Sequence, residues 1–208
     1  MNPSVKSGFG LPMISESGFS NGKPVFLSIN KNLFMTYCEY CRKLPLDNIH
    51  RIYHDTKYGV KISDDNELFG RLILEINQAG LSWDIILKRE EHFRRAFDNF
   101  NIDRIAQYTP SVIDQLMTNE GIIRHRKKIE AVVYNANQVI ALRTEHGSFF
   151  AWLESIETKN TEDWVKLFKK NFKFVGTEIV KEFLFSLGII EGAHEKGCPI
   201  LTHKKLTI

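Results

Sequence analysis

All three cysteines of this chain lie in two short segments that also contain histidine. In the first segment, Cys38 and Cys41 form a Cys-x-x-Cys pair that is followed by His54. In the second, His194 and Cys198 stand four positions apart near the C-terminus. Two thiolates and two imidazoles make the tetrahedral nitrogen and sulfur set that zinc prefers. We therefore predict a zinc ion that joins the two segments, with Cys38 and Cys41 competing for one position.

The alternative is that the cysteines are small buried apolar residues and that the histidines lie at the surface. His50 and His203 are further imidazoles that could complete a metal site. The pairing of one cysteine with one histidine in each segment favours the metal site, because it supplies a complete ligand set.

A second set of residues has the character of a phosphate-binding element. Gly121 lies in a short segment that runs directly into five successive basic-type residues, Arg124 to Lys128. A glycine-bearing turn before a helix presents backbone N–H groups that bind phosphate, and this arrangement is typical of a helix-hairpin-helix. The alternative is an ordinary turn followed by a solvated helix start.

Glu75 is the carboxylate that the sequence places in the most apolar surroundings. On a helical wheel it falls beside Leu68 and Leu72, at the margin of an apolar stripe, and Gln78 lies about one turn further on. A carboxylate in such surroundings must be paired, hydrogen-bonded or functional, because an isolated buried charge is costly. The alternative is that Glu75 lies at the edge of the stripe, where its carboxylate reaches solvent or pairs with an arginine that has a structural role.

Aromatic residues lie on both sides of Glu75 in the sequence, and two more lie in the C-terminal half of the chain. Aromatic walls with one acceptor suit a flat ligand that carries hydrogen-bond donors, such as a nucleobase, although core packing explains most aromatic residues. The residues concerned are Tyr53, Tyr58, Trp83, Phe172 and Phe174.

The elements that must position these residues are helices. Asp64 and Glu67 resemble a capping box that opens a helix, which runs to about Gln78 and ends at Gly80. Period-two strands and internal repeats are not evident, so the predicted fold class is all-α. Further helices are predicted over 89–97, 110–117 with Thr109 as N-cap, a long stretch from about 124, 149–155, 162–171 and 177–187, with Gly188 as a stop.

Composition narrows the class of protein without identifying it. The 208 residues carry a formal charge of +3, which permits nucleic acid as a partner but does not require it. Three cysteines cannot form a disulfide framework, which favours a reducing, cytoplasmic location, and no apolar run is long enough to cross a membrane. Residues 1–36 are rich in serine and glycine and are predicted to form a flexible or loosely ordered leader to a helical domain over 37–208.

Taken in order, these motifs resemble one family, DNA-3-methyladenine glycosylase I, the zinc-containing type within the helix-hairpin-helix superfamily. The resemblance spans Cys41 to Cys198, and its most specific strings are Gln-Ala-Gly-Leu-Ser-Trp at 78–83 and Gly-Ile-Ile-Arg-His-Arg at 121–126. The other matching stretches are Tyr-His-Asp at 53–55, Tyr-Gly-Val at 58–60, Phe-Lys-Phe-Val-Gly-Thr at 172–177 and the terminal His194 and Cys198.

The resemblance implies a structural zinc ion held by Cys41, His54, His194 and Cys198. The 13-residue spacing between Cys41 and His54 matches that family and favours Cys41 over Cys38. Four protein ligands leave no open position for a catalytic water on the metal.

The resemblance also implies the roles of the remaining residues. Glu75 matches the carboxylate that reads the donor edge of the methylated adenine, and we expect it to be the catalytic residue. The residues expected to bind the base are Tyr53, Tyr58, Trp83, Gln78 and Phe174. Those expected to grip the DNA backbone are Gly121, Arg124, Arg126 and Lys127.

Two positions depart from the family pattern, and both concern substrate selectivity. Tyr58 stands where tryptophan is usual, and His50 where tyrosine is common. The expected reaction is hydrolysis of the N-glycosidic bond of 3-methyladenine in alkylated double-stranded DNA by base flipping. The chain is expected to act as a monomer with no membrane partner. The alternative is a non-catalytic, zinc-stabilised module that recognises damage without cutting.

Overall fold

A computed structural model describes residues 19–20, 23–24, 35–158 and 160–200. Apart from a short antiparallel pair, β1 (Phe19–Ser20) with β2 (Lys23–Pro24), the regular structure of these residues is helical, which confirms the all-α prediction. None of the described helices is both long and apolar enough to span a bilayer. Most of the predicted leader, residues 1–36, lies outside the described residues.

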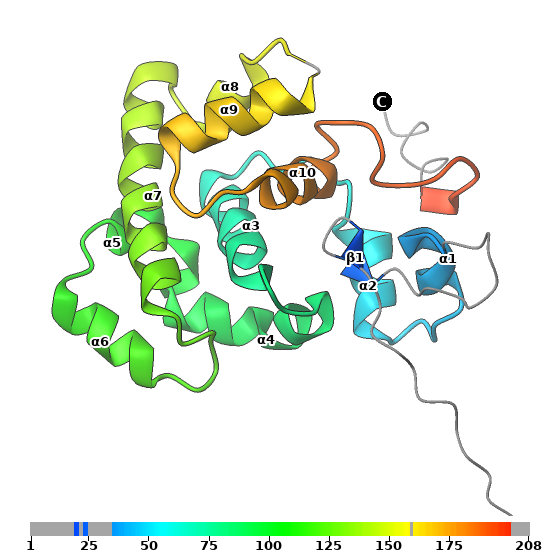
Figure 1. Cartoon of the computed structure of the whole chain (residues 1–208), viewed down its shortest axis with the longest axis horizontal. Helices are drawn as coiled ribbons and strands as arrows, with labels where there is room; N and C mark the ends of the chain where they lie inside the picture. The colour runs from blue at the N-terminus through cyan, green and yellow to red at the C-terminus, as the bar shows by residue number, and fades with distance from the viewer. Residues whose placement is uncertain (1–18, 21–22, 25–34, 159, 201–208) are drawn as a thin grey trace, which may run out of the picture.

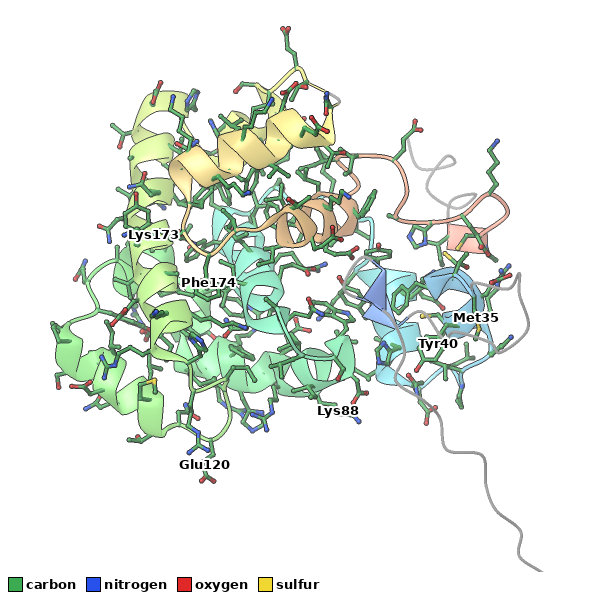
Figure 2. All side chains as sticks on the ribbon, viewed as in Figure 1. Met35, Tyr40, Lys88, Glu120, Lys173 and Phe174 are labelled. Carbon is green, nitrogen blue, oxygen red and sulfur yellow. The ribbon has the colours of Figure 1, made fainter. Side chains whose placement is uncertain are left out.

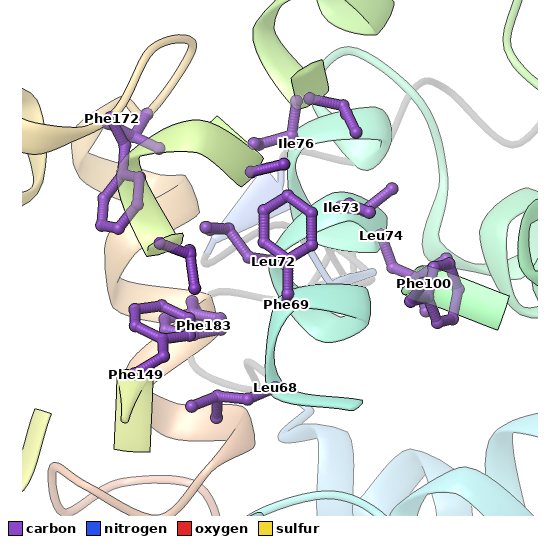
Figure 3. Packing of buried hydrophobic residues seen from close by; sticks show 14 of the residues in the cluster. Leu68, Phe69, Leu72, Ile73, Leu74, Ile76, Phe100, Phe149, Phe172 and Phe183 are labelled. Carbon is purple, nitrogen blue, oxygen red and sulfur yellow. The ribbon is translucent and has the colours of Figure 1, made fainter. Parts of the chain in front are cut away.

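Helix α3 (Asp65–Gln78) occupies the centre of the molecule and carries Glu75. The side chain of Asp64 accepts a hydrogen bond from the backbone N–H of Glu67, as the sequence predicted, so the cap fixes where the helix starts. Every residue from Leu68 to Gln78 is buried, because other helices cover α3 on several sides (Figure 3). These neighbours include α4 (Trp83–Ala96), α7 (Arg126–His146), α8 (Phe149–Glu154) and α10 (Thr177–Ser186).

The turn after α3 is short and tightly bonded. Gly80 has a φ of +84°, a conformation that favours glycine, and the backbone N–H of Leu81 donates to the carbonyl of Gln78 at 2.7 Å. Ser82 is the N-cap of α4, which therefore begins at Trp83 and not near Arg89 as predicted. The turn thus places Trp83 close in the chain to Glu75, at the beginning of a new helix.

The predicted hairpin lies between α6 (Pro110–Thr118) and α7. Thr109 caps α6 with proline at the first helical position, and the side chain of His125 accepts from the backbone N–H of Lys128 at the start of α7. Elements α5 (Ile102–Ile105) and η1 (Asp98–Phe100) precede α6, and α9 (Thr161–Asn171) lies beside α10.

The two segments that contain cysteine meet at one end of the molecule (Figure 1). Helices α1 (Tyr37–Arg42) and α2 (Ile49–Thr56) pack together, and the chain after α10 crosses back to them. At the crossing a Cβ on Gly188, whose φ is +66°, would lie 2.8 Å from the carbonyl oxygen of Gly59. Gly188 therefore ends the last helix, as predicted, and also permits this close approach.

Candidate active site and metal centre

Four buried side chains converge where the N- and C-terminal segments meet. Cys38, His54, His194 and Cys198 each offer a ligand atom, and these atoms lie within 4.8 Å of one another. His54 Nε2 lies 3.2 Å from Cys38 Sγ, 3.2 Å from His194 Nδ1 and 3.8 Å from Cys198 Sγ. His194 Nδ1 lies 3.6 Å from Cys38 Sγ and 3.5 Å from Cys198 Sγ.

These separations are those of a tetrahedral metal site. Zinc–sulfur bonds of about 2.3 Å and zinc–nitrogen bonds of about 2.0 Å, at tetrahedral angles, place neighbouring ligand atoms roughly 3.3–3.8 Å apart. The outer nitrogens of both imidazoles are also engaged: His54 Nδ1 lies 2.6 Å from Asp55 Oδ1, and His194 Nε2 lies 3.0 Å from the carbonyl oxygen of Tyr58. Such acceptors fix the ring orientation and the tautomer that a metal-binding histidine needs.

Of the two cysteines on α1, it is Cys38 that joins this cluster, whereas the sequence favoured Cys41. Both lie on α1, where three residues rotate the side chain by about 300° and advance it by ~4.5 Å. The Cys38 thiol lies 3.6 Å from His194 Nδ1 in the C-terminal segment, whereas the Cys41 thiol donates to the carbonyl oxygen of His50 at 3.5 Å.

The two spare histidines are not part of the cluster that the structure describes. His50 is buried, and its Nδ1 lies 3.2 Å from the hydroxyl of Tyr37. Its Nε2 lies 3.5 Å from a carboxylate oxygen of Asp84 on α4. His50 therefore joins α2 to α1 and α4, and His203 lies outside the described residues.

Glu75 is buried, with 2% of its surface exposed, which excludes the alternative of an edge residue that reaches solvent. Three of the predicted aromatic residues pack against one another: the rings of Tyr53 and Trp83 lie 5.2 Å apart at 63°, and those of Tyr53 and Tyr58 lie 5.8 Å apart. All three are buried, and Trp83 Nε1 has no hydrogen-bond partner among the described residues.

The charges around Tyr58 show that two carboxylates and one guanidinium share this region. Burial raises the pKa of the Tyr58 hydroxyl well above its usual value, and the negative charges of Glu182 and then Glu75 raise it further, whereas Arg71 lowers it. Arg71 also donates to the hydroxyl of Tyr53 at 2.8 Å. These side chains therefore form a buried group of charged and polar residues in which Tyr58 remains a neutral phenol.

Sequence reasoning missed two members of this group, Arg71 and Glu182. Both are buried, and both interrupt apolar stretches, since Arg71 lies four residues before Glu75 and Glu182 directly precedes Phe183. A charged residue on the apolar face of a helix was the signal that singled out Glu75, and the same signal identifies these two.

The metal cluster and the aromatic pocket share a wall. Tyr53 directly precedes His54 on α2, and the backbone of Tyr58 accepts the hydrogen bond from His194. The rings of Tyr58 and His194 also lie 5.5 Å apart at 70°. The position of both tyrosines therefore depends on the arrangement of the metal ligands.

The basic run at the hairpin divides into an exposed part and a buried residue. Arg124, His125, Arg126 and Lys127 are exposed, and Lys128 is buried. Arg126 is paired with Asp114 and lies 3.8 Å from Glu130, and its hydrogen bond with Asp114 raises its pKa. Four exposed basic-type side chains next to the turn at Glu120 (Figure 2) form a surface that is suited to phosphates.

Two of the predicted contacts lie differently from what the sequence suggested. The backbone N–H of Gly121 donates to the side chain of Asn119 at 2.9 Å, so this N–H is already hydrogen-bonded within the hairpin. Phe174, 38% exposed with a φ of +61°, lies on the loop before α10, and its ring packs on His125 at 5.7 Å (Figure 2). Phe174 thus stands at the surface beside the hairpin, unlike the buried Tyr53, Tyr58 and Trp83.

Comparison with known proteins relates this arrangement to one group. A family model described as methyladenine glycosylase matches residues 43–166. A DNA-3-methyladenine glycosylase of Haemophilus influenzae is 36% identical over 181 residues, which cover 78% of this chain and 97% of the relative. DNA-3-methyladenine glycosylase 1 of Escherichia coli is 32% identical over 179 residues, which cover 77% of this chain and 95% of the relative.

Solved structures show the same likeness. A variant of 3-methyladenine DNA glycosylase I in complex with 3-methyladenine matches with a TM-score of 0.69 and 34% identity, covering 80% of this chain and 97% of that one. The Staphylococcus aureus 3-methyladenine DNA glycosylase I matches with a TM-score of 0.68 and 33% identity, covering 79% and 97%.

Proposed function

Because the chain belongs to the methyladenine glycosylase family and is a DNA-3-methyladenine glycosylase I, we propose that it acts on a 3-methyladenine nucleotide flipped out of alkylated double-stranded DNA. It cleaves the N-glycosidic bond of that nucleotide, and Glu75 is the residue that reads the base. The observation that carries this proposal is the buried Glu75 carboxylate on α3, in a region walled by Tyr53, Tyr58 and Trp83.

The chemistry requires little from the protein beyond recognition and positioning. A 3-methyladenine base in a nucleotide carries a positive charge, so the glycosidic bond breaks with its electron pair moving to the base, which leaves as a neutral molecule. Water then adds its oxygen to the sugar carbon and releases a proton. Flipping exposes this bond, and the cost is lower for a damaged base that pairs and stacks poorly.

Glu75 accounts for selectivity toward the damaged base. A carboxylate accepts hydrogen bonds, and the N–H groups of adenine lie on the edge that such an acceptor would face. Inside a buried pocket, the attraction between a carboxylate and a cationic base is stronger than in water. An unmodified adenine lacks that charge, so it gains less from the same contact.

The aromatic residues would hold the base on its faces, and Gln78 would shape the pocket through the following turn, since its Nε2 donates to the carbonyl of Leu81 at 2.8 Å. Tyr58 presents a smaller ring than the tryptophan usual in the family, which leaves a larger space for the base. Phe174, at the surface beside His125, would contact DNA at the mouth of the site.

The proposed metal is zinc, held by Cys38, His54, His194 and Cys198. A bound zinc ion with four protein ligands supplies a cross-link and leaves no position for a reacting water. What this chain gains is a fixed wall, because the metal ligands lie beside Tyr53 and Tyr58. A cytoplasmic location fits three cysteines that form no disulfide with one another. We also propose that the protein acts as a monomer.

The test is to incubate the protein with methylated duplex DNA and measure the free bases released by chromatography. We expect 3-methyladenine to appear in proportion to time and enzyme concentration. Binding of the methylated duplex without release of any base would overturn the enzyme assignment and would favour a module that recognises damage without cutting it.

A separate prediction concerns the hairpin surface. Arg126→Ala should weaken binding to undamaged duplex and should reduce the slope of log affinity against log salt by about 0.9, the value for one phosphate contact. The pairing of Arg126 with Asp114 means that this contact forms by exchange of partners. Binding measured by fluorescence anisotropy at several salt concentrations decides this, and an unchanged slope would show that Arg126 does not contact phosphate.

A further inference from the structure

Lys128 is the buried member of the basic run at the hairpin. Only 5% of its surface is exposed, in contrast to the four basic-type residues before it. It lies in the first turn of α7, and its Nζ donates to the carbonyl oxygens of Asn77 at 3.0 Å and Ala79 at 2.8 Å. Lys128 thus extends from the hairpin helix to the end of the helix that carries Glu75.

The end of α3 is a favourable place for a buried ammonium group. The last carbonyls of a helix have no partner within the helix, and together they carry a partial negative charge that attracts cations. Burial lowers the pKa of Lys128, which shows that this side chain is partly withdrawn from water. Its two hydrogen bonds to carbonyls compensate for the water that it loses.

The carbonyls that Lys128 holds belong to the segment that connects the two sides of the base pocket. Ala79 is the C-cap of α3 and lies within the Gln78–Leu81 turn, whose ends are joined by hydrogen bonds in both directions. Glu75 precedes this turn and Trp83 follows it. Because the turn is closed by its own two hydrogen bonds, Lys128 fixes the position of the turn relative to α7 and leaves the geometry within the turn unchanged.

The other side of the connection is the hairpin. The backbone N–H of Lys128 donates to the side chain of His125, and Arg89 on α4 donates to the carbonyls of Glu120 and Ile122. The hairpin is thus bonded to α4 through Arg89 and to the end of α3 through Lys128. These contacts join the two elements that must act together on one nucleotide.

We propose that Lys128 is a positioning residue, which sets the base pocket at the correct distance and orientation from the hairpin that grips the DNA. This proposal rests on the function proposed above. Lys128 itself contacts neither the base nor the phosphates. Its backbone belongs to the hairpin end of α7 and its Nζ binds the end of α3, so Lys128 holds the hairpin and the base-binding site in position to act on the same flipped nucleotide.

The test measures base binding, duplex binding and excision separately in the variant Lys128→Met. This substitution keeps the aliphatic stem of the side chain and removes its hydrogen-bond donors. Single-turnover excision from methylated duplex should slow by 10- to 100-fold, as expected for misplacement of about 1 Å. Affinity for free 3-methyladenine, affinity for undamaged duplex and its salt slope should each stay within twofold. Lys128→Arg retains charge and donors, so its rate should lie above that of Lys128→Met.

The control is Lys166→Met, the same substitution at an exposed position on α9. An unchanged excision rate in Lys128→Met would overturn the proposal. A lower duplex affinity with a smaller salt slope would also overturn it and would make Lys128 a phosphate contact. An equal loss of affinity for free base would show that Lys128 shapes the pocket alone.

Two outcomes need a further comparison. If Lys128→Met does not fold, the same measurements are made on Lys128→Arg. The proposal would be overturned if Lys128→Arg excised the base at the rate of the unsubstituted protein but bound free 3-methyladenine tenfold more weakly. Failure of the function itself looks different, because the unsubstituted protein would then release no 3-methyladenine at all.

Discussion

Glu75→Gln is expected to lower the rate of 3-methyladenine release on the order of 100-fold, or ~2.7 kcal/mol of transition-state stabilisation. The substitution keeps the size of the side chain and removes its negative charge. The amide would still accept one hydrogen bond from the base, but it would no longer attract a cationic base in a buried pocket. The rate should be measured under single-turnover conditions, so that product release does not limit it.

The matched control is Glu67→Gln, which makes the same change on the same helix. Glu67 is exposed and paired with Arg94, outside the pocket. An exposed ion pair contributes little to stability, so this variant should fold normally. Because Glu67 is not one of the base-binding residues, the variant should also retain its rate of base release. If Glu75→Gln kept its rate within threefold while thermal unfolding was unchanged, the assignment of Glu75 would be wrong.

Cys38→Ala is expected to abolish stoichiometric zinc binding and to lower the melting temperature by roughly 10–20 °C. The proposed metal would join residues up to 160 positions apart (198 − 38), and closing a loop of this length is worth about 5 kcal/mol by analogy with a disulfide. For a domain of this size each kcal/mol corresponds to about 2–4 °C. Zinc should be counted by mass spectrometry after removal of loosely bound metal.

Cys41→Ala is the matched control, because the two cysteines lie one helical turn apart on α1. It leaves the four ligands intact and removes one small buried group, so a loss of about 1 kcal/mol is expected with one zinc ion retained. The reverse result, retention of zinc by Cys38→Ala and its loss in Cys41→Ala, would show that Cys41 is the ligand.

The sequence predicted helix α3 well because its signals are local. Asp64 and Glu67 mark its start, and Gly80 follows its end, so neighbours in the chain determine both boundaries. The predicted start of α4 was six residues too late, and its N-cap, Ser82, makes no side-chain hydrogen bond to the helix. Helices α1 and α2 were not predicted, since such short helices depend on packing more than on propensity.

The site shows the same limit. The structure brings His54, His194 and Cys198 together, as the sequence suggested, but Cys38 lies with them where Cys41 was expected, because the family spacing does not specify which of two cysteines on one helix packs toward the C-terminal segment. Lys128 looked like part of an exposed basic run. It lies four residues before the buried Val132, however, and this spacing places both on the same face of α7.

The long separation between the metal ligands also has a consequence for biosynthesis. Cys38 and His54 leave the ribosome early, and the partners that complete their coordination are translated about 140 residues later. A nascent chain therefore carries both elements of the pocket, α2 and α3, before it can close the cluster that steadies them. Chains that terminate before Cys198 would have a complete hairpin and Glu75 but only an open metal site, and cellular proteases would remove them more readily than the finished protein.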